Sequence, residues 1–314
     1  MNTKLEQSVL AKPAVETVPA GSIVVGIDGS SSSHRALSWA VDQAVAEHRA
    51  LTVVHATGAL VPPWIDQAMA DPYAAREAML TAAGEVLGEA RREAERWAAG
   101  RIEVHGVLRM SDARELLGEL SEDAAMLVLG SHGRGPVRSA LLGSVGVSLV
   151  RRAACPVVIH RPGHLGAVRN GVLVGVEGTA RSVTALDFAF RLAAQRDLPL
   201  TVLHCFWDVE AATTPAHLVG DRSDQLVEQR LLLAETMSGM TELYPQVRVR
   251  TELARGLPDR SLVLMGQRMD VLVVGASRGE HQSALTFGSV ATSVVEHATC
   301  AVAVLPHQDQ GPVR

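Results

Sequence analysis

The sequence predicts two tandem α/β domains, each a doubly wound parallel sheet with helices on both faces. Three observations lead to this fold class. Short apolar, β-branched runs alternate with longer segments of helical periodicity, as in consecutive strand–helix–strand units. The whole pattern then occurs a second time along the chain. The composition is 47% hydrophobic but only 3% aromatic, so the cores must consist of valine, leucine, isoleucine and alanine, as in buried parallel sheets.

The duplication is visible as matching segments at a nearly constant distance. Asp28 corresponds to Glu177, 149 positions later, whereas Cys155 corresponds to Cys300, 145 positions later. The second copy has therefore lost four residues between these points. A period of this length is too long for a solenoid repeat and indicates a duplicated domain. The matching segments are 23–30 with 172–179, 51–55 with 200–204, 126–130 with 271–275, and 142–145 with 287–290.

The boundary between the copies is expected near residues 160–166, where a proline and two glycines indicate a linker. The scattered charges at the N-terminus, without an apolar stretch, do not resemble a signal peptide. We therefore expect a flexible leader over residues 1–20, the first domain over 21–161, the linker over 162–170 and the second domain over 171–307.

The elements of the first copy follow in alternation from a strand over 22–27. The first helix, over 33–49, has Leu37, Val41 and Ala44 on one face, at helical spacing. Further strands are expected over 51–56, 102–108, 125–129 and 156–160, and further helices over 73–99, 112–120 (with Ser111 as its N-cap) and 144–153. The long helix of the second copy is marked by Leu226, Leu233, Met237 and Met240. Such alternation predicts parallel strands joined by right-handed crossovers, with ligands bound at their carboxyl ends.

The bulk properties exclude several classes of protein. The formal net charge of −5 argues against a general affinity for nucleic acid or for an anionic membrane. No run of about 18 apolar residues predicts a membrane span. The three cysteines have neither zinc-site nor disulfide-framework spacing, which favours a cytoplasmic protein. Cys155 and Cys300 are expected to be small buried hydrophobic residues, with redox sensing as the alternative.

The strongest candidate site is a glycine-rich loop in the first copy. Gly130 and Gly133 flank a short turn, and nine residues later Gly143-Ser144 opens a predicted helix. A helix N-terminus offers unpaired N–H groups and a positive dipole end, which suit a phosphate. Arg134 in the loop would reach the outer phosphates. In the alternative interpretation, the glycines only make turns and Ser144 only caps its helix.

Asp28, at the end of the neighbouring first strand, has two interpretations. Its carboxylate would accept hydrogen bonds from ribose hydroxyls if a nucleotide lay at this edge. Asp followed by Gly and Ser is, however, also common in turns and helix caps, so that Asp28 would then cap the first helix.

Taken together, these residues resemble the universal stress protein family in its tandem form. The resemblance lies in Val25 to Ser30, in Val54-His55-Ala56, in Leu129 to Gly133 and in Gly143-Ser144-Val145, and it extends over residues 22–306. The family's ATP-binding pattern is Gly, two residues, Gly, nine residues, Gly and then Ser or Thr, which the first copy matches throughout. The resemblance implies five parallel strands in the order 3-2-1-4-5, ATP binding, dimerisation and a role in stress or dormancy adaptation.

The resemblance also implies which residues would contact ATP. Gly26 and Asp28 would lie against the ribose, and the backbone of Ala56 would hold the adenine edge. The ribose and phosphates would be lined by Leu129, Gly130, His132, Gly133, Arg134, Gly143, Ser144, Val145 and Gly146. A bound Mg²⁺ or Mn²⁺ would be held mainly by the phosphates themselves, with no dedicated protein metal site.

The second copy departs from this pattern at two positions. Glu177 replaces the aspartate, and Arg278 replaces the second glycine, where a side chain would fill the space of a phosphate. If that position needs a positive φ, a residue other than glycine costs about 1 kcal/mol or more. We therefore expect a weaker second site, or none. Its residues would be Glu177, Gly275, Arg278, Gly288, Ser289 and Val290.

The expected function is that of an ATP-binding regulator, and two alternatives stay open. One is an interaction scaffold in which ATP is structural or absent, and the other is a nucleotide-dependent enzyme. The sequence has no Walker loop, nucleophile elbow or visible catalytic set, so at most slow ATP hydrolysis is expected. The apolar fifth strands, 157–159 and 302–304, are expected at sheet edges, where they would pair with each other or form a homodimer.

Overall fold

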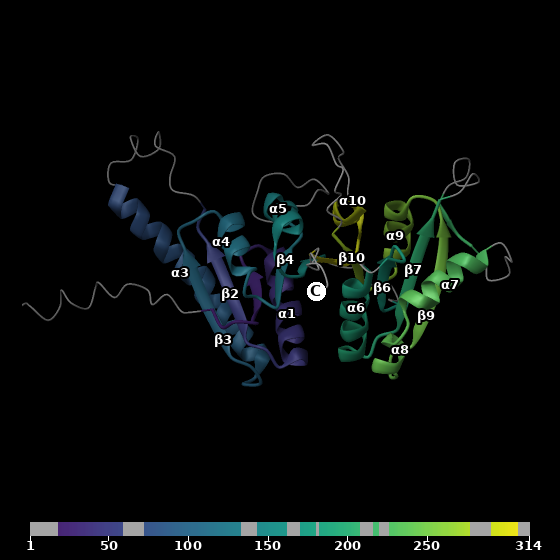
Figure 1. Ribbon diagram of the computed structural model, residues 1–314. Coiled ribbons are helices and arrows are strands. Elements are labelled where there is room, and N and C mark those ends of the chain that lie inside the picture. Colours follow the sequence, from purple (N-terminus) through teal and green to yellow (C-terminus); the bar gives the residue numbers. More distant parts are fainter. Residues whose placement is uncertain are drawn as a thin grey trace, which may run out of the picture.

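The computed structural model describes residues 18–58, 72–132, 143–161, 170–179, 182–207, 216–219, 226–276 and 290–306. These residues form one continuous sheet of eleven strands with helices on both faces (Figure 1). The strands of the first copy are β1 (Ile23–Gly26), β2 (Leu51–Ala56), β3 (Val104–Arg109), β4 (Met126–Gly130) and β5 (Val157–His160). Those of the second are β6 (Val172–Val176), β7 (Leu200–Phe206), β8 (His217–Leu218), β9 (Val249–Arg255), β10 (Val271–Gly275) and β11 (Ala301–Leu305).

The predicted strand order is confirmed in both copies. The sheet runs β3-β2-β1-β4-β5 and then β11-β10-β6-β7-β9-β8, so that each copy has the order 3-2-1-4-5. Within each copy these five strands are parallel, and they place their carboxyl ends at one edge. The site predicted at the ends of β1 and β4 therefore lies between two adjacent strands.

The two copies join through their fifth strands, as one of the two expected pairings of these strands predicts. β5 and β11 pair in antiparallel fashion, with Val158 opposite Ala303 and Ile159 opposite Val302. The intramolecular alternative for these apolar strands is thus the one the structure adopts. Within this chain β5 lies between β4 and β11, and β11 lies between β5 and β10, so neither fifth strand is at an edge of the sheet.

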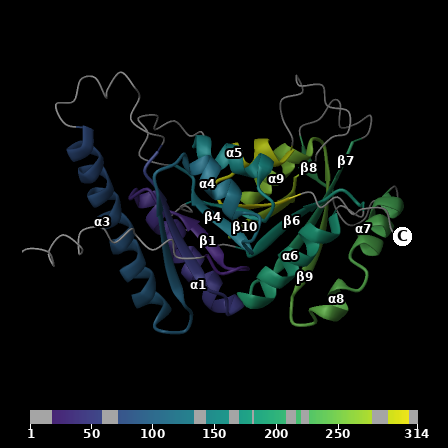
Figure 2. The same cartoon turned by 60° about the vertical axis from the view of Figure 1, so that its left-hand side comes forward.

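The helices cover the two faces of the sheet in a fixed division (Figure 2). On one face α1 (Ser31–Glu47), α3 (Pro72–Ala98), α6 (Ser182–Gln195), α7 (Val227–Thr236) and α8 (Met240–Leu243) pack against one apolar core. On the other, α4 (Ala113–Leu120), α5 (Ser144–Arg152), α9 (Pro258–Gly266) and α10 (Val290–His297) enclose a second core. The two clusters are alternate residues of the same strands, as the pleat of a β-strand requires.

Four local features differ from, or add to, what the sequence predicts. Asp112, and not Ser111, is the N-cap of α4, since its carboxylate accepts a hydrogen bond from the backbone N–H of Arg114. The long helix of the second copy is interrupted between α7 and α8 by Gly239, whose φ of +81° ends helical geometry. A short strand, β8, pairs with the outer edge of β9 and was not predicted from the sequence. Val18, placed in the leader, packs against the core of the first copy.

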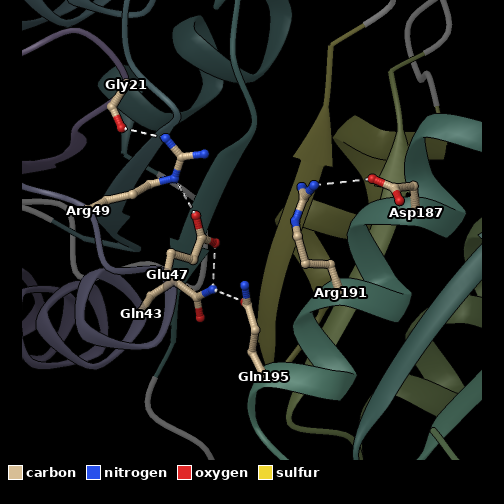
Figure 3. Close-up of polar contacts among 7 residues, drawn as sticks. All are labelled: Gly21, Gln43, Glu47, Arg49, Asp187, Arg191 and Gln195. Atoms are coloured by element: carbon tan, nitrogen blue, oxygen red, sulfur yellow. Dashed lines mark hydrogen bonds and ion pairs between the residues drawn. The ribbon is translucent and has the colours of Figure 1, made fainter. Parts of the chain in front are cut away.

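A polar contact also links the copies, where α1 and α6 lie side by side (Figures 1 and 3). The amide nitrogen of Gln43 in α1 donates to Glu47 and, across the boundary, to Gln195 in α6 at 2.9 Å. Arg196 donates from Nε to Gln43 at 2.9 Å, and its guanidinium lies 4.4 Å from the ring centroid of Trp39. Gln43 is almost fully buried and is therefore the centre of this contact.

Replacing Gln43 by leucine is expected to destabilise the pairing of the copies. Leucine has a similar side-chain volume, but it leaves the half-buried Nε of Arg196 without its acceptor, at a cost of about 1–3 kcal/mol. Urea unfolding, followed by tryptophan fluorescence, to which the buried Trp39 contributes, measures the effect. Gln195→Leu is the control, since it removes one acceptor and leaves the bond to Arg196 intact. An unchanged urea midpoint in Gln43→Leu would show that the contact contributes nothing.

The three cysteines all lie among the described residues and form no disulfide. Burial raises the pKa of the Cys155 thiol from 9.0 to about 12 and that of Cys205 to about 11. At neutral pH the reactive thiolate is therefore scarce, which argues against redox sensing by Cys155 in the folded chain.

The pH dependence of stability should carry the signature of Cys155. Its pKa is raised in the folded state, so its contribution to stability is fully present below pH 9 and is lost as the pH rises toward about 12. Denaturation midpoints are expected to fall over this range. The fall should be shallower in Cys155→Ala, after correction for the lower stability of that variant at pH 7. Equal slopes in the two proteins would contradict the assignment.

Candidate functional site

The turn after β1 is fixed by a set of short hydrogen bonds. Gly29 has a φ of +77°, a conformation that glycine adopts without strain, and it lets the chain turn directly into α1. The N–H of Ser30 donates to Asp28 Oδ1 at 2.9 Å, while Ser30 Oγ accepts from the N–H of Ser33 and caps α1. The alternative in which Asp28 is the helix cap is thus wrong. Its half-buried carboxylate instead stands beside the start of α1.

The end of β4 lies directly against the start of α1. A Cβ atom at Gly130 would come within 2.7 Å of the backbone carbon of Ser32, so this strand end requires glycine. The N–H of His132 donates to Ser32 Oγ at 3.4 Å, and Ser30 Oγ donates to the carbonyl of His132 at the same distance. The ends of the two strands are therefore held together by hydroxyl groups.

The start of α5 is brought to the same place. The N–H of Gly143 donates to the carbonyl of Ser131 at 3.1 Å, which joins the far end of the glycine loop to the end of β4. Gly143 is the N-cap, and no side chain caps the helix. Ser144 is the exposed first residue of α5, so the alternative that it only caps the helix is wrong. The first N–H groups of α5, those of Ser144 to Gly146, consequently have no partner within the helix.

Two predicted site residues, Gly26 and Leu129, lie on the side of their strands that faces the apolar core. A Cβ at Gly26 would lie 2.7 Å from Leu129 Cδ2, because the leucine side chain fills the space beside the glycine. Leu129 is buried, so any contact it makes with a ligand would come from its backbone. Ala56 ends β2 and is half-buried, with its backbone at the carboxyl edge.

The described part of the first copy thus brings together Asp28, Gly130, His132, Gly143 and Ser144. Gly133 and Arg134 lie outside the described residues, and so do Arg278, Gly288 and Ser289 of the second copy. Within the described residues no three His, Cys, Asp or Glu side chains gather in a way that could hold a metal ion. No helix of the described part of the chain is long and apolar enough to cross a membrane.

Sequence reasoning missed the serines of this site. Ser30, Ser32 and Ser33 connect Asp28, Gly130 and His132, and Ser131 is buried with its hydroxyl 2.9 Å from His132 Nδ1. The signal was present as four consecutive serines directly after Asp28-Gly29. A run of hydroxyl groups at a helix start is typical of caps and turns, so the sequence alone does not indicate that these serines also join the two strand ends.

The second copy has the same strands and helices around the corresponding position, but different residues line it. Glu177 is exposed, with its N–H bonded to Ser182 Oγ at 2.9 Å, and Leu232 of α7 packs against Gly178 in the following turn. At Gly275, at the end of β10, no described atom lies within 4 Å of where a Cβ would stand. Val290 begins the described part of α10. Among the described residues, close packing of a strand end on a helix start is therefore seen at Gly130 and not at Gly275.

Comparison with known proteins identifies the family. The model of the universal stress protein family matches the chain twice, over residues 20–161 and 169–306. The chain belongs to the universal stress protein family. It is a tandem-domain universal stress protein, since the two matches correspond to the two copies.

Relatives of this universal stress protein have the same tandem length. A universal stress protein of Mycobacterium tuberculosis strain H37Rv is 34% identical over 294 residues, covering 90% of this chain and 96% of its own. A second protein of that name from the same strain is 31% identical over 287 residues, covering 90% and 95%. The crystal structure of a universal stress protein from Archaeoglobus fulgidus superposes with a TM-score of 0.68 at 18% identity, over 92% of this chain and 97% of that one, which supports the fold.

Proposed function

We propose that the first copy of this universal stress protein binds ATP, and that the chain acts as a nucleotide-dependent regulator in stress or dormancy adaptation. The observation that carries the proposal is the hydrogen bond from Gly143 to Ser131. It sets the uncapped N-terminus of α5 beside the Gly130 turn and next to the strand end that bears Asp28. An anion-binding helix end and a carboxylate at one edge suit the two polar parts of a nucleotide, its phosphates and its ribose.

Each polar group has a proposed partner on ATP. Asp28 would accept hydrogen bonds from the ribose hydroxyls. The N–H groups of Ser144, Val145 and Gly146 would donate to phosphate oxygens, with the Ser144 hydroxyl beside them. Gly130 leaves no side chain in the way at the strand end. Mg²⁺ or Mn²⁺ would be held by the phosphates, because the described residues supply no cluster of metal ligands.

We propose that the second copy binds ATP weakly or not at all. Its acidic residue, Glu177, is longer by one methylene and exposed to solvent, and Leu232 packs over the turn that follows it. Arg278 adds a side chain where the first copy has Gly133. One nucleotide per chain is therefore the expected occupancy.

Release of bound small molecules from the purified chain tests the proposal. The protein is washed, denatured, and the supernatant is analysed for nucleotides by chromatography and mass spectrometry. ATP in amounts close to those of the chain supports the proposal. A chain that releases no nucleotide, and that binds none when ATP is added, would contradict it and favour an interaction scaffold without ATP.

A further inference from the structure

A buried histidine reaches the residue just before Asp28. His55, near the end of β2, has its Nδ1 atom 2.6 Å from the carbonyl oxygen of Ile27. A carbonyl can only accept a hydrogen bond, so Nδ1 carries the proton and donates. The N–H of Ile27 in turn donates to the carbonyl of Val54 at 2.8 Å. Both backbone groups of Ile27 are therefore bound to the end of β2.

The peptide unit between Ile27 and Asp28 is held at both of its ends. His55 binds its carbonyl, and the hydroxyl of Ser33 lies 3.4 Å from its N–H, which belongs to Asp28. Because a peptide unit is planar, two such contacts fix the orientation of the plane in which the Cα of Asp28 lies. The bond from Ser30 N–H to Asp28 Oδ1 then sets the carboxylate itself.

The second copy repeats this clamp atom for atom. His204 Nδ1 lies 3.0 Å from the carbonyl of Val176, and Ser182 Oγ accepts from the N–H of Glu177. Both histidines are more than nine-tenths buried, so their ring nitrogens must find hydrogen-bond partners within the protein rather than in solvent. In each copy the clamped peptide is the one that presents the acidic residue.

We propose that His55 is a positioning residue that aims the carboxylate of Asp28 at the ribose hydroxyls of the bound nucleotide. This rests on the proposed function and adds to it the group that sets sugar selectivity. His55 touches neither nucleotide nor phosphate in this role and acts only through the Ile27–Asp28 peptide. The same clamp in the second copy directs Glu177, whose longer side chain ends in solvent.

Selectivity between sugars tests the proposal, because a histidine that only stabilised the fold would not change it. Dissociation constants for ATP, 2′-deoxy-ATP and 3′-deoxy-ATP are measured by calorimetry on the full chain. The unmodified chain should prefer ATP over at least one deoxy form by about tenfold, the worth of one hydrogen bond to a charged group. His55→Leu should reduce this preference to about threefold or less.

Two variants control for loss of structure. His55→Asn places an amide N–H near the position of Nδ1 and should restore most of the preference for ATP. His204→Leu removes the equivalent bond in the second copy and should leave the preference unchanged. If His55→Leu weakened all three nucleotides by the same factor, or if His204→Leu lowered the preference equally, the positioning role would be overturned.

Hydrogen exchange separates this inference from the proposed function. In the unliganded chain, His55→Leu should speed exchange of the Asp28 and Ser30 amides several-fold, while His55→Asn and His204→Leu should not. Unchanged exchange at both amides would overturn the clamp. If the unmodified chain bound no nucleotide, the proposed function would fail together with the ribose role, whereas faster exchange would still show that His55 holds the turn.

Discussion

Replacing Gly130 by alanine is expected to abolish ATP binding to the chain and to lower its stability. The new Cβ would lie 2.7 Å from both the backbone carbon and the hydroxyl oxygen of Ser32, closer than folded proteins allow. Backbone cannot move aside as a side chain does, so the end of β4 must shift away from α1. Overpacking of this kind costs about 1–3 kcal/mol, and a shift of the strand end would separate Asp28 from the start of α5. Calorimetric titration with ATP and urea unfolding measure the two effects.

Gly275→Ala is the matched control for this substitution. Gly275 occupies the corresponding strand end of the second copy, is exposed, and has no described neighbour within 4 Å of a new Cβ. Its replacement should leave both ATP affinity and the urea midpoint within error of the unmodified chain. If Gly130→Ala retained full ATP affinity, the assignment of the site to the first copy would fail.

A proline at Val158 is expected to separate or unfold the two copies. Val158 is fully buried in β5, between β4 and β11, near the centre of the eleven-stranded sheet. Proline there removes a ladder hydrogen bond and introduces a ring into a closely packed strand, a change that central strands do not tolerate. The cost should exceed about 3 kcal/mol, at the large end of single substitutions. Urea unfolding and limited proteolysis between the copies report it.

Val104→Pro provides the comparison on an edge strand. Leu51 donates to the carbonyl of Glu103, which directs the backbone of the next residue, Val104, away from β2. As the first residue of an edge strand, this position accepts proline at small cost. Equal destabilisation by the two prolines would show that the β5–β11 junction has no special weight in the stability of the chain.

Most of the fold could be predicted from the sequence because it rests on local periodicity and on the repeat. The strand order follows from alternation of strands and helices and from the family pattern, and the start of α5 at Ser144 was placed correctly from Gly143-Ser144. The N-cap of α4 could not be predicted, since Ser111 and Asp112 are both good N-cap residues and only tertiary packing selects one. The break of the second copy's long helix depended on one glycine, Gly239, which a helical pattern tolerates in sequence.

The parts that could not be predicted are contacts between segments distant in sequence. An apolar strand such as β5 pairs equally well with a partner in the same chain or in another, so the pairing with β11 needed the structure. The close approach of Gly130 to Ser32 and the bond from His55 to Ile27 join residues about 100 and 28 positions apart. Glycines, serines and histidines in these places have ordinary structural interpretations, which only the geometry distinguishes from a site.

The central claim is that the chain has one working nucleotide site and that it lies in the first copy. Calorimetric titration of the purified chain with ATP tests it most directly, since it reports stoichiometry and affinity together. The expected result is one ATP per chain, with binding lost in Gly130→Ala and retained in Gly275→Ala. Two equivalent sites per chain, or one site that survives Gly130→Ala and disappears in Gly275→Ala, would contradict it.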